Sequence, residues 1–214
     1  DDLFNMDPER YTGKTADLPV YEQPVLYMGH LRPHFGHFLM ETLANWWALT
    51  EDLGDVERYL FHAANESLPE RSYIKASLDG LGINQDNLLI FNEPMRLKTV
   101  LVPESSFQLH SHIYPKYKDI VHRLARNLGA EEAKTSDQPV FLSRSKDTHG
   151  VRQYVGQEQI EAFLAGRGVR IVHPNQLTFA EQLKVVNEHT HLLGFQGSQL
   201  HNIIGALEPK TVIY

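Results

Sequence analysis

The sequence predicts an α/β fold, in which strands and helices alternate along the chain. Short apolar runs typical of buried strands are followed by segments whose apolar residues recur at helical spacing. One such strand, His191–Phe195, leads through Gly197 and Ser198 into a helix-like run. This alternation indicates parallel strands covered by helices. Ligands of such sheets lie beyond the carboxyl ends of the strands.

Composition sets the broad class. The chain has 214 residues, 42% of them hydrophobic and 22% charged, which allows one large or two small globular domains. A net charge of −7 argues against a general nucleic-acid surface. Cysteine is absent, which excludes disulfides and thiolate metal sites and fits a reducing compartment. No apolar run approaches the roughly 18 residues of a membrane span, so we expect no transmembrane segment.

The first half of the chain is expected to follow an irregular, turn-rich lead-in over residues 1–19. Apolar runs predict strands at Pro24–Met28, Arg58–His62, Asn87–Phe91 and Leu97–Val102. Helical spacing predicts helices from about His37 to before Gly54, over Glu70–Leu81 and over Pro115–Leu128. Pro33 and Gly36 indicate a loop before the first helix, and Pro115 and Gly129 suit the start and stop of the third.

Residues 131–139 are polar and contain no apolar residue larger than alanine, so we interpret them as a linker. The expected domains are therefore 1–130 and 140–214. The second contains regular strands, namely Val140–Leu142, Val169–His173, His191–Phe195 and Thr211–Tyr214. Its expected helices are Glu158–Leu164, one opened by a capping box at Thr178–Glu181, and Ser198–Leu207. A loop, Ser143–Gly150, follows the first of these strands.

Two cations and one helix start follow strands of this second sheet. Arg144 and Lys146 lie on the loop after Val140–Leu142, and Gly197 and Ser198 lie after His191–Phe195. Glycine permits a tight turn and a close ligand approach, and a helix start offers free N–H groups. Arginine grips phosphate bidentately and lysine adds a point charge. A diphosphate is the natural ligand of this set, the alternative being solvated surface cations and a plain turn.

Three motifs in the same order resemble glycosyltransferase family 61. They are His34–Glu41 (HFGHFLME), Ser143–Lys146 (SRSK) and Gly194–Asn202 (GFQGSQLHN). The resemblance covers roughly residues 25–214. It implies two Rossmann-like domains facing a cleft, the GT-B arrangement, with residues 1–130 on the acceptor side and 140–214 binding the nucleotide-sugar. It also implies inversion at the anomeric carbon, no obligatory metal or cofactor, and a role in polysaccharide, capsule or surface-glycan synthesis.

The chain departs from the family pattern in two respects. Members continue into further helices beyond the strand that corresponds to Thr211–Tyr214, so we expect the second domain to be truncated. Gln196 and Gln199 stand where the family often has other small or polar residues, which bears on donor preference.

An inverting transfer needs a base for the acceptor hydroxyl and positive charge for the departing diphosphate. We favour His37 as the base, with Glu41 as its rival or its orienting partner four residues on, and His34 as a third candidate. The alternative is that His37 caps a helix and Glu41 pairs with a nearby cation. His201 and Asn202 are expected to contact the nucleotide or its phosphates, or else only to stabilise the turn.

Other functions stay open at this point. The chain could be a nucleotide-sugar-binding module without catalysis. It could also be a metal-dependent hydrolase, because His30, His34, His37 and Glu41 would share one face of a continuous helix and could bind zinc. Pro33 and Gly36 oppose such a helix.

The tryptophans Trp46 and Trp47 could stack on a sugar, although their helical spacing favours the core. We expect an inverting, metal-independent glycosyltransferase with a nucleotide-sugar donor and a glycan or polysaccharide acceptor. We expect it in the cytoplasm, beside a membrane-bound glycan assembly pathway.

Overall fold

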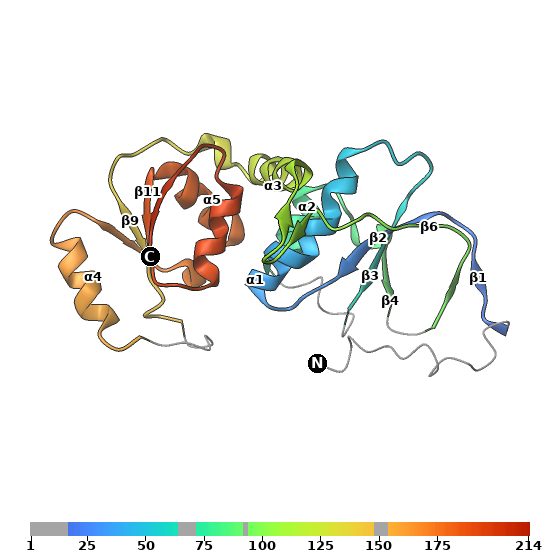
Figure 1. Cartoon of the computed structure of the whole chain (residues 1–214), viewed down its shortest axis with the longest axis horizontal. Coiled ribbons are helices and arrows are strands. Elements are labelled where there is room, and N and C mark those ends of the chain that lie inside the picture. The colour runs from blue at the N-terminus through green and yellow to red at the C-terminus, as the bar shows by residue number, and fades with distance from the viewer. Residues whose placement is uncertain (1–16, 64–71, 92–93, 148–153) are drawn as a thin grey trace.

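Two four-stranded sheets, each entirely parallel, form the framework of the chain in the computed structural model (Figure 1). The structure describes residues 17–63, 72–91, 94–147 and 154–214. Most of the expected lead-in, the start of the helix expected at Glu70 and the end of the loop Ser143–Gly150 lie outside these ranges. The prediction of a mixed α/β fold with parallel sheets and covering helices is confirmed.

The first sheet has the strand order β4-β3-β2-β6. Its strands are β2 (Val25–His30), β3 (Arg58–His62), β4 (Leu88–Phe91) and β6 (Val100–Leu101). The single strand expected over Leu97–Val102 is wrong. The segment instead forms β6 and a separate strand, β5 (Arg96–Leu97), which pairs with β1 (Val20–Tyr21). The chain changes partner between them, because Lys98 N–H bonds Tyr21 O while Thr99 O accepts from Val25.

A continuous helical stretch follows β2, and its geometry is irregular. It consists of α1 (Phe35–His37), a π-helix (Phe38–Thr42) and a 3-10 helix (Leu43–Thr50). The expectation of one regular helix starting at about His37 is therefore wrong in type and by two residues in position. Carbonyl groups of this stretch accept hydrogen bonds from residues elsewhere in the fold. Tyr117 donates to Leu39 O over 2.8 Å, and Ser106 donates its N–H and its hydroxyl to Ala44 O.

The other elements of this half cover the sheet or extend it. They are α2 (Ser72–Gly80), a 3-10 turn (Gln85–Asn87), the antiparallel strands β7 (Phe107–Gln108) and β8 (His112–Ile113), and α3 (Pro115–Asn127). Pro115 begins α3 as predicted, and Gly129 follows its end in the left-handed region that glycine favours. Trp46 is fully buried and donates to Met28 O over 3.1 Å, which confirms its place in the core.

The second sheet has the strand order β10-β9-β11-β12, and its strands closely match the predicted ones. They are β9 (Val140–Leu142), β10 (Arg170–Val172), β11 (His191–Leu193) and β12 (Thr211–Ile213). The helical elements are α4 (Gln157–Ala165), a 3-10 turn (Pro174–Gln176), α5 (Phe179–Glu188) and a 3-10 helix (Ser198–Gly205). The capping box at Thr178 and Glu181 is confirmed in both directions.

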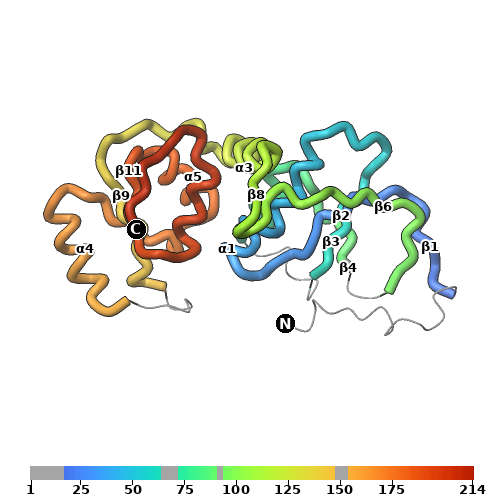
Figure 2. Tube along the Cα trace, in the orientation of Figure 1, coloured from blue at the N-terminus to red at the C-terminus, as the bar shows by residue number. Residues whose placement is uncertain are grey.

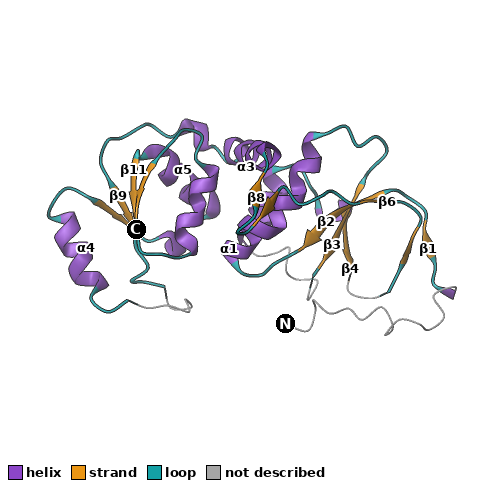
Figure 3. Cartoon of the chain, in the orientation of Figure 1, coloured by secondary structure: helices purple, strands orange, loops and turns teal. Residues whose placement is uncertain are grey.

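Helices lie between the two sheets, as the purple elements of Figure 3 show. Helix α5 joins the two cores, because Phe179 and Leu183 pack in the core of the first half while Val185 and Val186 pack against β9 and β11. The segment after α3 contains a 3-10 turn, Ala130–Glu132, and then runs along one side of the molecule to β9 (Figure 2). Within the described residues, no helix has the length and apolar character needed to span a bilayer.

Candidate functional site

The loop that follows β9 presents Arg144 at the carboxyl edge of the second sheet. Strand β9 lies between β10 and β11, so the chain runs from β9 to β10 on one side and then crosses to β11 on the other. This is the topological switch point, where ligands of such sheets sit. The loop after β11 contains Gly197 and Ser198 and flanks the same point. The predicted convergence of Arg144, Gly197 and Ser198 at one sheet edge is therefore present in the structure.

Hydrogen bonds from α4 and β10 hold the Arg144 loop in place. Ser143 donates its N–H to Val172 O and its hydroxyl to the Glu161 carboxylate, and Gln157 Oε1 accepts from the Arg144 N–H. Burial acts to raise the pKa of Glu161, but hydrogen bonds from the neighbouring serines and the contact with His173 outweigh it and lower that pKa. Glu161 is thus an ionised anchor beneath the loop at neutral pH.

Gly197 is required for space rather than for an unusual backbone conformation. Its φ is 167°, which is extended backbone open to any residue. A Cβ added at this position would lie 2.6 Å from Arg144 Nη1 and would also overlap Gln199 Oε1. The absence of a side chain lets the Arg144 guanidinium pack directly on the backbone of the glycine loop. The next residues, Ser198 and Gln199, begin the 3-10 helix, whose first N–H groups have no partner within the helix.

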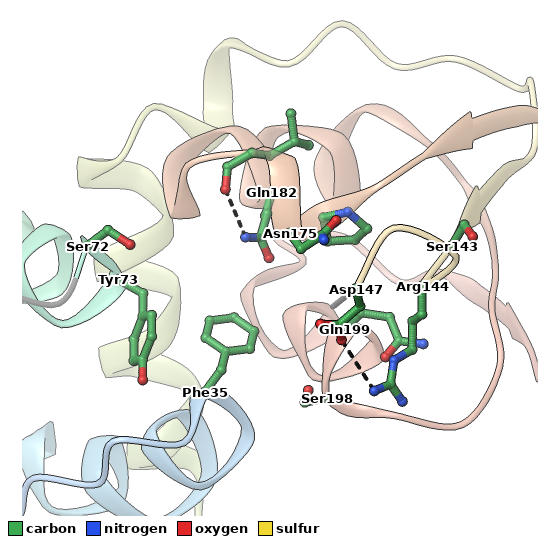
Figure 4. A pocket seen from close by; sticks show the side chains of 12 residues that line it. Phe35, Ser72, Tyr73, Ser143, Arg144, Asp147, Asn175, Gln182, Ser198 and Gln199 are labelled. Carbon is green, nitrogen blue, oxygen red and sulfur yellow. Dashed lines mark hydrogen bonds and ion pairs between the residues drawn. The ribbon is translucent and has the colours of Figure 1, made fainter. Parts of the chain in front are cut away.

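A cavity of about 270 Å³ opens beside this loop, between the two halves of the chain. Figure 4 shows Phe35 and Tyr73 on one side of it and Arg144, Asp147 and Gln199 on the other. The remaining lining residues are mostly polar, namely Ser72, Ser143, Pro174, Asn175, Leu177, Gln182 and Ser198. A mixture of aromatic faces, amides and one cation suits a polar ligand that carries both hydroxyls and negative charge.

A second cavity, of about 320 Å³, lies on the other side of Arg144. Arg144 and Asp147 line both cavities. The second one is otherwise formed by Tyr154 and the start of α4, together with Ser145. The Tyr154 ring stacks on Phe195 at 4.6 Å, and its hydroxyl donates to Gln196 O over 3.0 Å. Arg144 therefore stands between two adjoining cavities, each near the lower end of the size range of small-molecule sites.

The histidine segment of the first half forms a chain of paired side chains. His37 Nδ1 contacts the Glu41 carboxylate, whose other oxygen lies 3.2 Å from Arg32 Nε. Because Glu41 occupies one ring nitrogen of His37, Nε2 is the nitrogen left to accept a proton. His34 lies edge-on to His37, with ring centroids 5.2 Å apart. The i,i+4 pairing expected for His37 and Glu41 is present even though the helix is not regular.

The histidine segment and the glycine loop meet directly. Gly36 is buried against the second half, and a Cβ at this position would lie 2.8 Å from His201 Nδ1 and 3.2 Å from Ser198 Cβ. Burial, followed by the nearby His34 and His37, lowers the pKa of His201. Residues more than 160 positions apart along the chain thus form one site, at which His201 is neutral at pH 7.

Two of the expected ligand contacts occupy other positions. Asn202 is 1% exposed, and its amide donates to Gln182 Oε1 and to Gln199 O. It therefore supports the wall of the first cavity from behind. Lys146 is exposed and lines neither of the two cavities, while its carbonyl accepts from Asn175.

Three residues that line the first cavity were not predicted as site residues from the sequence, namely Phe35, Tyr73 and Asp147. Phe35 lies inside a motif that was singled out for its histidines. Asp147 lies three residues after Arg144 in a loop, a spacing at which a carboxylate can reach the cation. This spacing was the one sequence signal that could have pointed to Asp147.

The geometry does not support a zinc site on the histidine segment. His30 ends β2 and stacks on His62 at 5.1 Å, whereas the helical stretch begins only at Phe35. His30 and His34 therefore do not share a helix face with His37. Among the residues that the structure describes, no three His, Asp or Glu side chains are grouped so that they could hold a metal ion.

Comparison with known protein families decides the class. The family model Glycosyltransferase 61 matches residues 35–214, which is most of the chain. The chain belongs to glycosyltransferase family 61. The match begins at Phe35, on the wall of the first cavity, and includes His37, Arg144 and the glycine loop. A search of curated proteins gave no significant match.

Membership of family 61 indicates glycosyl transfer in general terms. Such a reaction has two substrates, a sugar donor and an acceptor. Arg144 and the glycine loop lie in the second half of the chain, and the His37–Glu41 pair lies in the first half.

Proposed function

We propose that this family 61 protein is an inverting, metal-independent glycosyltransferase with a nucleotide-sugar donor and a glycan or polysaccharide acceptor. The observation that carries the proposal is the direct contact of Gly36 with Ser198 and His201. This contact supports a single site made of the segment with the proposed base and the proposed anion-binding loop. Each lies on a different half of the chain, so donor and acceptor would be held by different halves.

The diphosphate of the donor would lie on Arg144 and on the N–H groups at the start of the helix Ser198–Gly205. A guanidinium and preorganised N–H groups stabilise the negative charge that develops on a departing diphosphate. The Arg144 side chain is only 11% exposed, so water screens its charge weakly. This arrangement supplies positive charge from the protein itself, which is the basis for proposing transfer without a metal.

The acceptor hydroxyl would give its proton to His37 Nε2 as its oxygen attacks the anomeric carbon. The bond from that carbon to the diphosphate oxygen breaks, and the leaving group carries away the negative charge. Attack from the face opposite to the leaving group inverts the anomeric configuration. Glu41 would hold His37 in the required tautomer and stabilise the imidazolium, while Arg32 holds Glu41. Glu41 itself is the rival base.

The two-lobed GT-B arrangement, with residues 1–130 facing 140–214, is part of the proposal. It is supported by the two parallel sheets and by the cavity lined from both halves. The shared helix α5 packs the halves more closely than a flexible linker at 131–139 alone would. A capsule or surface-glycan pathway and a cytoplasmic location stay predictions, which the identified acceptor and cell fractionation would test.

The test is a calorimetric titration of the protein with UDP, GDP, CDP and dTDP, each with and without EDTA, followed by transfer assays with the matching nucleotide-sugars. We expect one nucleotide to bind equally well with the chelator, and its sugar conjugate to be turned over with inversion. Binding without transfer to any acceptor would indicate a nucleotide-sugar-binding module instead. Loss of binding in EDTA would contradict the metal-independent mechanism.

A further inference from the structure

The side chain of Gln199 lies buried beneath the Arg144 guanidinium with an unused hydrogen-bond acceptor. Gln199 is 7% exposed, and its Nε2 donates to Phe195 O over 2.6 Å. A carbonyl can only accept, so this bond fixes the orientation of the amide. Its Oε1 is buried and makes no hydrogen bond with any residue that the structure describes. Buried acceptors without a donor are rare and costly, so this one calls for an explanation.

The Arg144 guanidinium is a hydrogen-bond donor close to this acceptor. Arg144 Nη1 and Gln199 Oε1 both pack against the Cα of Gly197, around the point where a Cβ would stand. The guanidinium is nevertheless turned toward Asp147, with Nη2 3.4 Å from Asp147 Oδ2. That distance is longer than the 2.7–2.9 Å of a well-formed charge-assisted bond. Arg144 is therefore loosely paired with an anion while an unused acceptor lies beside it.

Asp147 also weakens the binding of an anion at Arg144. It lines both cavities next to Arg144, and its N–H bonds Arg144 O over 2.9 Å, which keeps the two residues together across one turn. A carboxylate so placed competes with a diphosphate for the same guanidinium and repels it.

We infer that Arg144 exchanges partners when a diphosphate binds, leaving Asp147 and donating to Gln199 Oε1. The exchange rests on the proposed function, because it takes Arg144 as the diphosphate ligand. In the exchanged state Gln199 positions the guanidinium and satisfies its own acceptor. The guanidinium N–H groups that Asp147 releases then face the diphosphate. When Asp147 pairs with Arg144 again, it helps to expel the product nucleoside diphosphate. Gln199 thus raises the affinity for the diphosphate, whereas Asp147 lowers it and speeds product release.

The experiment measures the affinity of UDP, GDP and inorganic pyrophosphate by calorimetry for two variants of the pair. Asp147→Asn removes the competing charge with little change of shape, and we expect affinity to rise about threefold to tenfold. Gln199→Met removes the acceptor while keeping the length of the side chain, and we expect a loss of similar size. Gln199→Glu, which offers Arg144 a permanent anion in place of the amide, should weaken binding more than Gln199→Met.

Matched controls separate the exchange from general effects. Asp137→Asn removes the same charge from an exposed position, and Gln108→Met makes the same replacement at an exposed position on β7 that lines neither cavity. Both should leave the affinities unchanged. Thermal unfolding of every variant, measured without ligand, shows whether a weaker site reflects a damaged loop. An affinity loss in Gln199→Met with an unchanged melting temperature supports a positioning role.

Product release gives a second readout for the same pair. Stopped-flow displacement of the bound nucleotide should show slower dissociation from Asp147→Asn than from the wild type. If the wild type binds a nucleotide and Asp147→Asn binds it equally or more weakly, the exchange is wrong and the proposed function stands. If neither protein binds UDP, GDP or pyrophosphate, the proposed function and the exchange fail together.

Discussion

The helical stretch Phe35–Thr50 and the unit from β9 to β12 differ in how they reach their structure. The β9–β12 unit is regular, and its strands follow the local apolar pattern almost residue for residue. The Phe35–Thr50 stretch passes through α, π and 3-10 geometry, because donors from distant parts of the chain form hydrogen bonds with its carbonyl groups. Local pattern thus builds the proposed binding half, and long-range hydrogen bonds shape the segment that carries the proposed base.

The contrast suggests that the two regions have different roles, one in catalysis and the other in binding. Irregular helical turns are frequent at functional sites, since they aim side chains that a straight helix would place elsewhere. His37 and Glu41 lie where the α-helix gives way to the π-helix. Arg144 and Gly197 lie instead on loops of a regular sheet, so the proposed anion site lies at the switch point. Chemistry and binding should therefore respond to separate mutations.

The largest expected effect is on turnover by a variant of the irregular stretch. His37→Ala removes the proposed base, so we expect kcat to fall about 10²- to 10⁴-fold. The affinity for the nucleoside diphosphate should stay unchanged, because Arg144 and the glycine loop are intact. Steady-state transfer assays and calorimetry measure the two quantities, with His191→Ala as a control at an exposed histidine. Normal turnover by folded His37→Ala would remove it from the mechanism.

The next effect is on binding, through the regular half. Arg144→Ala removes a charge-assisted contact to the diphosphate, which is worth about 1.5–3 kcal/mol or roughly a 10- to 150-fold loss of affinity. Calorimetry with the preferred nucleotide measures it. Arg167→Ala, at an exposed arginine that packs over Phe163 on α4, serves as the matched control. Equal affinities for the wild type and Arg144→Ala would contradict the donor site.

A smaller effect is expected where the two regions touch. Gly36→Ala inserts a methyl group 2.8 Å from His201 Nδ1, so one side of the contact must shift. We expect the free energy of unfolding to fall by about 1–3 kcal/mol, the usual cost of overpacking a buried site. Chemical denaturation measures it. Gly166→Ala, at φ −62° and with its nearest heavy atom at 3.4 Å, should be close to neutral. Equal stabilities for the two variants would mean that the contact is loose.

The smallest effect is a pH dependence of stability that arises at the same contact. Burial, then the neighbouring His34 and His37, lowers the pKa of His201 below its ordinary value of 6.5. The unfolded chain therefore takes up this proton at a higher pH than the folded chain. Stability from this source is fully present above pH 6.5 and is lost as the pH falls below it. Denaturation at pH 7.5 and pH 5.5 should show a smaller difference for His201→Gln than for the wild type, and an equal difference would contradict the assignment.

Much of the fold could be predicted from the sequence, because many single helices and strands are marked by residues within or next to them. Pro115 begins α3, and Thr178 with Glu181 opens α5, since these caps act within one turn of the chain. The split of Leu97–Val102 between two sheets could not be read in this way. Its apolar pattern is compatible with either partner, and the choice depends on Tyr21 and Val25, which lie far away in the sequence.

The candidate site divides in the same way. Residue chemistry and topology brought Arg144, Gly197 and Ser198 to one sheet edge, because parallel strands present their following loops together. Phe35 and Tyr73 were missed, since nothing local marks an apolar side chain as a cavity wall rather than a core residue. Asn202 was expected either to contact the ligand or only to stabilise the turn, and its bonds to Gln182 and Gln199 fit the second expectation.

The sequence by itself determined the alternation of strands and helices, the charged and glycine residues of the loops after β9 and β11, and the spacing of His37 and Glu41. These depend on neighbours within a few residues, whose geometry the backbone dictates. Only the tertiary structure decided that Gly36 meets His201 and that Arg144 packs on Gly197 between two cavities. Such contacts join residues far apart in the chain, and they depend on how whole elements pack, which no local pattern encodes.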